Sequence, residues 1–419
     1  MVLETADRQP IHVVYGGAQL FKAGTPARLG ALALDLIRTY TPDAQSFGEC
    51  LGLRGGALAH SVFERTISKL EREPVEDFRI DFEDGYGYRS ETEEDGHAVS
   101  TARLLASAAE KPAFPPFIGV RIKPLTQALA ARSARTLDLF LSALLQESKT
   151  LPRNFVFTLP KITTPGQVSE LVALIESAES RHALPAGTLK VELMIETPQN
   201  IIDPSGSFGI PKLLEAAQGR CRGLHFGPYD YSASCNIAAA EQRLDHPACD
   251  FARHVIQICA ADRGVMLSDG PSTILPIPRH RNPANDAERA ENRAVVHRAM
   301  RHHFDLVQRS LSHGYYQGWD LHPGQLPTRY AAVFAFFLKS LDPAAARLRN
   351  FIGQAAQATL AGDVFDDAAT GQGLLNFLLR GVNCGALTEP EAASSGLTIQ
   401  ELHTRSFLQI MENRRRAII

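Results

Sequence analysis

The sequence predicts a closed (β/α)8 barrel followed by a helical C-terminal extension, and three observations support this fold class. Eight short apolar runs lie between residues 11 and 323, and helical patterns separate them. That alternation is typical of right-handed βαβ units in a parallel sheet. After Gln325 only Ala- and Leu-rich helical sequence follows. Eight strands favour a barrel over the alternative, an open doubly wound sheet, and Gly16-Gly17 falls short of the glycine fingerprint that a dinucleotide-binding open sheet carries.

Composition narrows the classes of protein. The chain has 419 residues, 44% of them hydrophobic, and 43 basic against 46 acidic residues. This balance provides no basic face for nucleic acid. Six cysteines without a CxxC pair indicate neither a zinc site nor a redox dithiol. No segment resembles a signal peptide or approaches the roughly 20 apolar residues that span a bilayer, so we expect a cytoplasmic protein with no membrane partner.

The first predicted elements are a strand at 11–15, closed by the Gly16-Gly17 pair, and a helix that opens at Thr25 and runs through Arg38. Between residues 41 and 76 lie a Gly-rich loop and a helical stretch around 63–71. This is more chain than one crossover needs, so we expect an insertion that serves as a lid or an interface element.

The remaining strands and the extension follow in order. Strands are expected at 78–85, 117–122, 155–161, 190–198, 223–231, 265–271 and 315–323. The Pro-, Arg- and Asn-rich stretch 276–286 is either a loop on the catalytic rim or a surface excursion. Helices are expected at 330–341, 344–360, 373–379 and 398–416, with no strand among them. We therefore assign residues 1–328 to the barrel, with insertions at about 41–76 and 276–300, and 329–419 to an extension that packs on the barrel bottom or on a partner subunit.

Two carboxylates stand at the ends of neighbouring strands. Glu196 ends the run Lys190–Pro198, and Asp230 ends the run Gly223–Tyr231. Mg²⁺ is commonly held by one or two carboxylates together with water and substrate oxygens, so this pair predicts a Mg²⁺ site, with Mn²⁺ as a substitute. The alternative is that each acid only caps the helix that follows it.

Other charged residues share the strand ends, where barrel enzymes place their catalytic groups. Arg121 can hold a carboxylate or enolate oxygen through its two parallel N–H groups, or it can form a salt bridge to Glu83 or Asp84. Lys161 is either a Schiff-base lysine or, as we prefer, a charge partner of Glu83 and Asp84. Asp269 is as consistent with a turn as with a site. His322 either contacts substrate or caps the last strand.

A family resemblance rests on seven motifs in order. They are Asp81-Phe-Glu-Asp-Gly85, Val120-Arg-Ile122, Leu159-Pro-Lys161, Ile195-Glu-Thr-Pro198, Gly227-Pro-Tyr-Asp230, Asp269-Gly-Pro271 and His322-Pro-Gly-Gln325. Together they resemble the citrate lyase beta-subunit-like branch of the pyruvate/phosphoenolpyruvate-binding TIM barrels, a superfamily that also includes class II pyruvate aldolases and malate synthases.

The resemblance implies Mg²⁺ on Glu196 and Asp230, with Arg121 on the oxygen of a 2-oxo acid or an enolate. It implies that Glu83 and Asp84 support the metal waters and that Lys161 pairs with them. In this family an acid from a C-terminal helix, often from the next subunit, can reach the site. The sequence Gly362-Asp-Val-Phe-Asp-Asp367 is a loose counterpart, which nominates Asp366 as an acid or base and agrees with a homo-oligomer.

Substrate contacts are expected from Pro228, Tyr229 and His322 in addition to Arg121. The chain departs from the family pattern in having Gly-Pro-Tyr-Asp where Gly-x-x-Asp-Leu is commoner, and Thr197-Pro198 after the metal glutamate where a small residue is usual. The substrate and the use of CoA therefore stay open. Arg279, His280 and Arg281 are the candidates for an adenine-phosphate patch.

These observations predict a Mg²⁺-dependent carbon–carbon lyase or aldolase that acts through an enolate on a small-molecule 2-oxo acid, hydroxy acid or hydroxyacyl-CoA. One alternative is a malate-synthase-like condensation, or hydrolysis of an acyl-CoA thioester, because the same enolate serves both. Another is a non-catalytic barrel that binds a metabolite.

Overall fold

The computed structural model describes residues 8–109, 111, 114–353, 359–361, 364–366 and 368–418; for those within 353–369 and for 415, 417 and 418 it describes the backbone alone. The chain forms two compact units. The barrel unit comprises Pro10–Tyr40 and Lys69–Arg329. The helical unit comprises Thr41–Ser68 and Tyr330–Ile419 with the N-terminal residues through Gln9.

Eight parallel strands close the barrel in sequence order, from β1 paired with β2 round to β8 paired with β1. Their bounds are β1 His12–Gly17, β2 Asp77–Asp81, β3 Phe117–Arg121, β4 Phe155–Leu159, β5 Lys190–Ile195, β6 Cys221–Phe226, β7 Met266–Asp269 and β8 Gln317–Asp320. Every strand predicted from an apolar run is present, so the predicted (β/α)8 barrel is confirmed and the open sheet is excluded.

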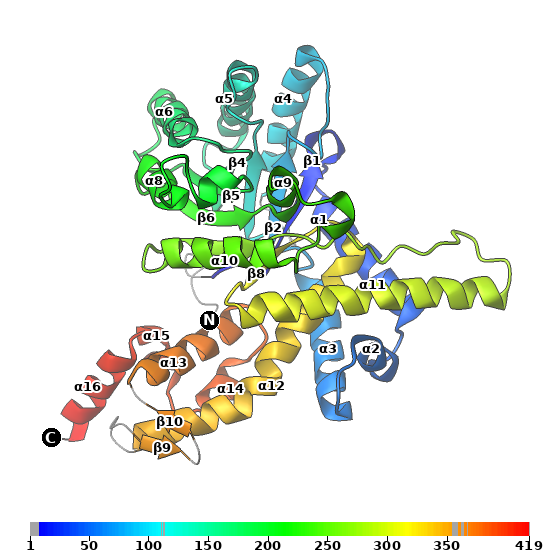
Figure 1. Cartoon of the computed structure of the whole chain (residues 1–419), viewed down its shortest axis with the longest axis vertical. Helices are drawn as coiled ribbons and strands as arrows, with labels where there is room; N and C mark the ends of the chain where they lie inside the picture. Colours follow the sequence, from blue (N-terminus) through cyan, green and yellow to red (C-terminus); the bar gives the residue numbers. More distant parts are fainter. Residues whose placement is uncertain are drawn as a thin grey trace. The chain divides into compact units, whose positions relative to one another are not determined.

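Helices surround this barrel (Figure 1), and α4, α5 and α6 are successive neighbours on its outside. The helices of the barrel unit are α1 Thr25–Tyr40, α4 Glu91–Ala108, α5 Ala130–Ser148, α6 Pro165–Arg181, α7 Pro198–Ile201, α8 Gly209–Ala216, α9 Pro228–Ser234, α10 Pro247–Ala260 and α11 Asp286–Ser312, with the 3-10 turns η2 Ala18–Leu20, η3 Ala239–Glu241 and η4 Pro323–Gln325. Local sequence explains their starts. For example, Ser90 accepts the Glu93 N–H at the start of α4, and acids fill that first turn, where the helix dipole favours negative charge.

The barrel interior contains buried charged residues. Alternate residues of β2 face inward, and Arg79 there donates to Asp77, to Glu192 of β5 and to Thr158 of β4. Gly119 of β3 makes room for this side chain, since a Cβ at that position would lie 3.2 Å from Arg79 Cδ and 2.4 Å from the Val156 carbonyl oxygen. A buried, paired guanidinium thus links three strands beneath the C-terminal end of the barrel.

The helical unit contains α2 Ala44–Leu51, α13 Ala368–Asn383, α14 Glu389–Ala393, α15 Ile399–Thr404 and α16 Phe407–Ile418. The helices α3 Gly56–Arg72 and α12 Leu326–Gly353 begin or end in the barrel unit. Arg65 of α3 joins two parts of the helical unit, because it binds Glu391 of α14 through two N–H groups at 2.5 and 3.1 Å.

Four local predictions were wrong. Residues 44–51 form α2 and not a loop; the signal was Asp43 and Ser46, which make a capping box, with Gly52 in the left-handed conformation at the other end. The helix α12 continues through Pro343, since its buried face persists on both sides at Leu341 and Ala344.

The third error is a short antiparallel hairpin, β9 Thr359–Ala361 with β10 Val364–Asp366, in the region predicted to be free of strands. Three-residue strands are too short for an alternation pattern to be seen. The fourth concerns 276–300, predicted as an insertion: residues from Asp286 onward belong to α11, the barrel helix between β7 and β8. Within the described ranges, no helix is both long enough and apolar enough to cross a bilayer.

Candidate active site

Four acidic residues and one lysine meet at the C-terminal ends of β2, β4, β5 and β6. Glu196 follows Ile195, the last residue of β5, and Asp230 lies in the first turn of α9 just after β6. Because β5 pairs with β6 along its length, with Ile195 opposite Phe226, the two acids leave neighbouring strands at the same edge. A short loop follows each strand, and the helix after the loop begins with Pro.

Glu196 is buried and tightly held. The backbone N–H of Lys161 donates to its Oε1 at 2.5 Å. Gly227 leaves the space that this side chain occupies, because a Cβ there would lie 2.5 Å from Glu196 Cβ and 2.6 Å from Oε2. Burial raises the pKa of Glu196 to about 7; Lys161 acts in the opposite direction and Asp230 adds to the rise. The high pKa of Glu196 thus follows mainly from its burial.

Lys161 lies among the acids. Its backbone is left-handed, with φ of 49°, which a residue with a Cβ adopts only where its surroundings enforce it. Its Nζ lies 3.1 Å from Glu83 Oε1, 3.2 Å from Asp84 Oδ2 and 3.3 Å from Asp230 Oδ2. Burial alone would lower the pKa of Lys161, but the carboxylates outweigh it and raise the pKa. An amine with a raised pKa is a poor Schiff-base nucleophile, so the role of charge partner fits this environment better.

The pKa values of Glu83 and Asp84, just beyond β2, are shifted in opposite directions. Burial raises the pKa of Glu83 against the lowering effect of Arg121. Asp84 is 63% exposed at its side chain, and Lys161 and Arg121 together outweigh the effect of burial and lower its pKa. Asp84 is therefore the more accessible acid of this pair, and the one whose pKa is lowered.

Arg121, at the end of β3, is buried and fully engaged. It donates to both oxygens of Asp81 at 2.7 and 2.6 Å, and its Nη1 lies 3.0 Å from Glu83 Oε2. Its guanidinium also stacks over the rings of Tyr15 and Trp319, 4.7 and 5.4 Å from their centroids. The salt-bridge alternative for Arg121 is thus what the structure shows, with Asp81 as its main partner.

Asp81, Tyr15 and Trp319 were not singled out from sequence. Asp81 could have been, because strand alternation places Asp77, Arg79 and Asp81 on the inward face of β2. The two aromatic residues come from β1 and β8, and nothing local in either strand indicates a contact with β3.

The acid cluster is suited to a hard divalent cation. The carboxylates of Glu196 and Asp230 both interact electrostatically with the Lys161 ammonium. Carboxylate oxygens are the ligands that Mg²⁺ prefers. No group of three or more His, Cys, Asp or Glu side chains in the described part of the chain has metal-binding geometry. A two-carboxylate site, with water and substrate oxygens as further ligands, is the arrangement that these residues can provide.

Three residues predicted to bind substrate, Pro228, Tyr229 and His322, make contacts within loops and turns. Pro228 packs against Gly270, where a Cβ would lie 2.2 Å from its Cδ, and the Tyr229 hydroxyl donates to the Pro271 carbonyl at 2.9 Å. Both residues therefore fix the loop after β7 to the loop after β6. His322 caps η4, accepting the Gly324 N–H at 3.0 Å through Nδ1.

Other predicted residues lie apart from the cluster. Asp269 is buried and accepts bonds from Arg253 and Ser310, so its environment is structural. Arg279 and His280 both pair with Glu291 of α11, and Arg281 carries no bond to the cluster. The backbone of Asp366 ends β10, while its side chain lies outside the described residues.

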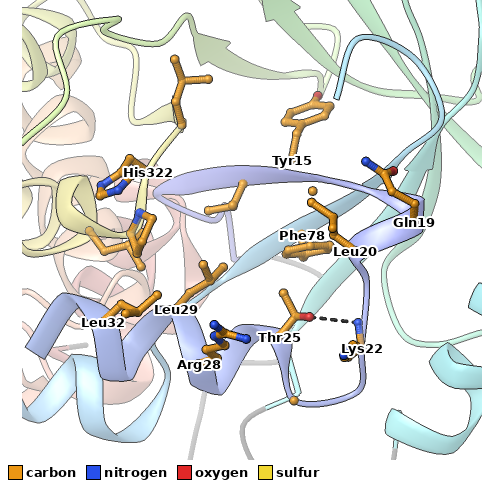
Figure 2. Close-up of a pocket in the computed structure, with 16 residues that line it drawn as sticks. Tyr15, Gln19, Leu20, Lys22, Thr25, Arg28, Leu29, Leu32, Phe78 and His322 are labelled. Carbon is orange, nitrogen blue, oxygen red and sulfur yellow. Dashed lines mark hydrogen bonds between the residues drawn. The ribbon is translucent and has the colours of Figure 1, made fainter. Parts of the chain in front are cut away.

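A pocket of about 750 Å³ lies beside β1 in the barrel unit (Figure 2). Leu29 and Phe78 contribute to its apolar wall, and Figure 2 shows Lys22 and Arg28 at one side and His322 at the other. None of its described lining residues is acidic. Tyr15 of β1 also belongs to the lining, but its ring, which stacks on Arg121, points away from Leu29 and Arg28 in Figure 2.

Comparison with solved structures shows a fold shared with a citrate lyase. A citrate lyase from Burkholderia xenovorans LB400 is 20% identical with a TM-score of 0.58, over 94% of this chain and 99% of that chain. Protein CitE from Mycobacterium tuberculosis, in complex with magnesium, acetoacetate and coenzyme A, is 15% identical with a TM-score of 0.49, over 90% and 99%. Haloferax volcanii malate synthase, in a magnesium and glyoxylate complex, is 15% identical with a TM-score of 0.46, over 97% and 98%.

The likeness to the Burkholderia protein confirms, at the level of fold, the resemblance to citrate lyase beta-subunit-like barrels that the ordered motifs indicated. Comparison with curated proteins gave no match. One family model spans nearly the whole chain, residues 3–410, and its description is a domain of unknown function, DUF6986. The chain therefore belongs to the DUF6986 family.

Proposed function

We propose that this protein is a Mg²⁺-dependent carbon–carbon lyase or aldolase that acts on a 2-oxo or hydroxy acid. One observation carries the proposal: Glu196 and Asp230 leave adjacent strands at the C-terminal end of the barrel and converge on one residue, Lys161, whose backbone N–H binds Glu196 and whose ammonium lies beside Asp230. The fold shared with a citrate lyase is compatible with it. Pairs of carboxylates at this position suit an oxygen-ligated divalent ion.

When bound, Mg²⁺ would act as a Lewis acid that stabilises negative charge on the carbonyl oxygen of the substrate. The chain's own residues would do the rest. In a retro-aldol cleavage the substrate hydroxyl loses its proton, the carbon–carbon bond breaks, and its electron pair passes to the carbon next to the carbonyl group.

The hydroxyl proton would go to a carboxylate of the Glu83–Asp84 pair, of which Asp84 is the exposed member. Arg121 would add positive potential beside the developing oxyanion, with Nη1, the atom it shares with Glu83, as the donor nearest the acids.

The test is a thermal-shift titration of metal-stripped protein with Mg²⁺ or Mn²⁺, alone and with pyruvate, oxaloacetate or glyoxylate, followed by turnover assays. We expect a metal-dependent shift that a 2-oxo acid increases and that Glu196→Gln or Asp230→Asn abolishes together with turnover. Glu215→Gln, an exposed acid on α8, is the matched control and should behave as wild type. Full activity in either site variant would overturn the proposal, and ligand-dependent stabilisation without turnover would favour a non-catalytic binding barrel.

A second candidate, cleavage or condensation of an acyl-CoA, is favoured by the pocket beside β1. Its volume of about 750 Å³ is within the usual range for small-molecule sites, and it combines apolar walls with the side chains of Lys22 and Arg28. An acyl thioester with a phosphorylated tail has the matching pattern of apolar and anionic parts.

This candidate predicts that Lys22→Gln with Arg28→Gln weakens the binding of an acyl-CoA but not that of pyruvate or glyoxylate. Arg38→Gln, an exposed arginine on the same helix α1 outside the pocket, is the control. Equal acyl-CoA affinity in the double variant and the control would remove this candidate and leave the first unaffected.

A further inference from the structure

The side chain of Lys161 makes three contacts with three different acids. An ammonium group has three N–H donors, and here Glu83, Asp84 and Asp230 each have one oxygen between 3.1 and 3.3 Å from Nζ. These acids come from the loops after β2 and β6, while the lysine itself follows β4. The ammonium thus crosses the mouth of the barrel and draws together groups from opposite sides of the site.

The backbone of the same residue binds a fourth acid. Its N–H donates to Glu196 Oε1 at 2.5 Å, and the left-handed φ of 49° lets the N–H and the side chain serve the cluster together. A strained conformation of this kind persists only where the surroundings enforce it. Both proposed metal ligands, Glu196 and Asp230, are therefore positioned by one residue.

From this geometry we infer that Lys161 is a built-in counter-ion of the metal site: its ammonium holds Asp230 in place before the metal arrives and releases it when Mg²⁺ binds. The inference rests on the proposed function, because it takes Glu196 and Asp230 as the metal ligands.

Electrostatics gives the reason. An ammonium and a divalent cation compete for the same carboxylate, since Asp230 Oδ2 cannot stay 3.3 Å from Nζ and also join a Mg²⁺ without the two cations approaching closely. Glu83 and Asp84 remain available to Lys161 after the exchange, so the freed ammonium keeps two partners. The lysine would prevent mutual repulsion of the acids in the metal-free protein and would reduce metal affinity by competition.

The inference predicts a change in the chemical reactivity of one amine. Metal-stripped wild-type protein is labelled briefly with acetic anhydride at pH 8.5, with and without saturating Mg²⁺, and labelling at each lysine is measured by mass spectrometry. We expect Mg²⁺ to increase labelling at Lys161 severalfold. Lys123 is the internal control, because it pairs with Glu94 and the Phe82 carbonyl and touches neither proposed ligand.

A pair of variants provides the complementary measurement. In calorimetric titrations at the same pH, Lys161→Met should bind Mg²⁺ about tenfold more tightly than wild type, the factor that corresponds to ~1.4 kcal/mol of lost competition. The metal-free form of Lys161→Met should also melt at a lower temperature than wild type. Lys123→Met should leave the Mg²⁺ affinity unchanged.

Outcomes separate the inference from the proposed function. If Mg²⁺ binds with unchanged Lys161 labelling, or if Lys161→Met binds it no more tightly than wild type, the counter-ion role is wrong while the metal site stands. If Mg²⁺ does not bind wild-type protein, both the metal site and the inference fail.

Discussion

At the scale of single residues, the site depends on close approaches that only particular side chains permit. Gly227 is the clearest case, because its missing Cβ leaves the space for Glu196. Its φ is not in the left-handed region, so the requirement for glycine is one of space and not of backbone conformation.

We therefore expect Gly227→Ala to displace the Glu196 carboxylate and to lower the affinity for Mn²⁺. The loss of Mn²⁺ binding free energy should be at least as large as the loss of unfolding free energy. The overpacking should cost ~1–3 kcal/mol of unfolding free energy, measured by urea titration. Gly223→Ala on the preceding strand β6 is the control, since its added Cβ would meet atoms no nearer than 3.4 Å. Equal metal affinity in the two variants would show that Glu196 has room to move.

Arg121 shows the same dependence on neighbours. Its sequence context allowed either a substrate contact or a salt bridge, and the structure gives the guanidinium two carboxylate partners and two aromatic rings. A cation with this many contacts is fixed in position, which suits a group that adds electrostatic potential without moving.

At the scale of elements, the ends of helices α15 and α16 are joined by one acid. Glu401 accepts the Thr398 N–H at 2.8 Å in a capping box, and it also binds Arg414 of α16 through two N–H groups. The Arg414 hydrogen bonds are the largest cause that lowers the pKa of Glu401 to about 2.

This shift gives a pH dependence with a defined sign. A carboxyl group whose folded pKa lies below its ordinary value of 4.5 stabilises the fold above that value, and the contribution is lost as the pH falls towards about 2. Glu401→Gln should therefore melt below wild type at pH 6, and the difference should narrow between pH 4.5 and 2. Circular dichroism melts would check this, and a gap that is constant with pH would contradict the assignment.

At the scale of the whole molecule, the helical unit is assembled from distant parts of the sequence. The segment Thr41–Ser68 belongs with Tyr330–Ile419 and not with the barrel strands between which it is inserted. The ion pair of Arg65 with Glu391 is one link across this separation.

Truncation after Arg329 should therefore leave the helices α2 and α3 without most of their unit. We expect such a chain to bind a hydrophobic dye and to form aggregates on size-exclusion chromatography, because apolar side chains such as Phe47 and Val62 are fully buried in the intact protein. A truncated chain that also replaces residues 44–66 with a short linker is the comparison. If both chains were equally monomeric, the two segments would not depend on one another.

The barrel could be predicted from the sequence because each of its strands has a local pattern of apolar residues. Apolar runs such as 155–159 are buried on both faces, and a charged residue or a turn ends each one. The charged residues at the strand ends could also be placed together, since the C-terminal ends of all the parallel strands lie at one end of the barrel. Glu83, Lys161, Glu196 and Asp230 could be grouped for this reason from the sequence alone.

Other features could not be predicted, because their causes lie far away along the chain. The pairing of Arg121 with Asp81 and its stacking on Trp319 depend on strands that meet only when the barrel closes. The left-handed backbone of Lys161 and the room that Gly227 leaves for Glu196 likewise arise from neighbouring strands. The sequence by itself determined the strands, their order and the charges at their ends, since periodicity is local; tertiary structure alone decided which charges neutralise one another, since Coulomb interactions depend on distance in space.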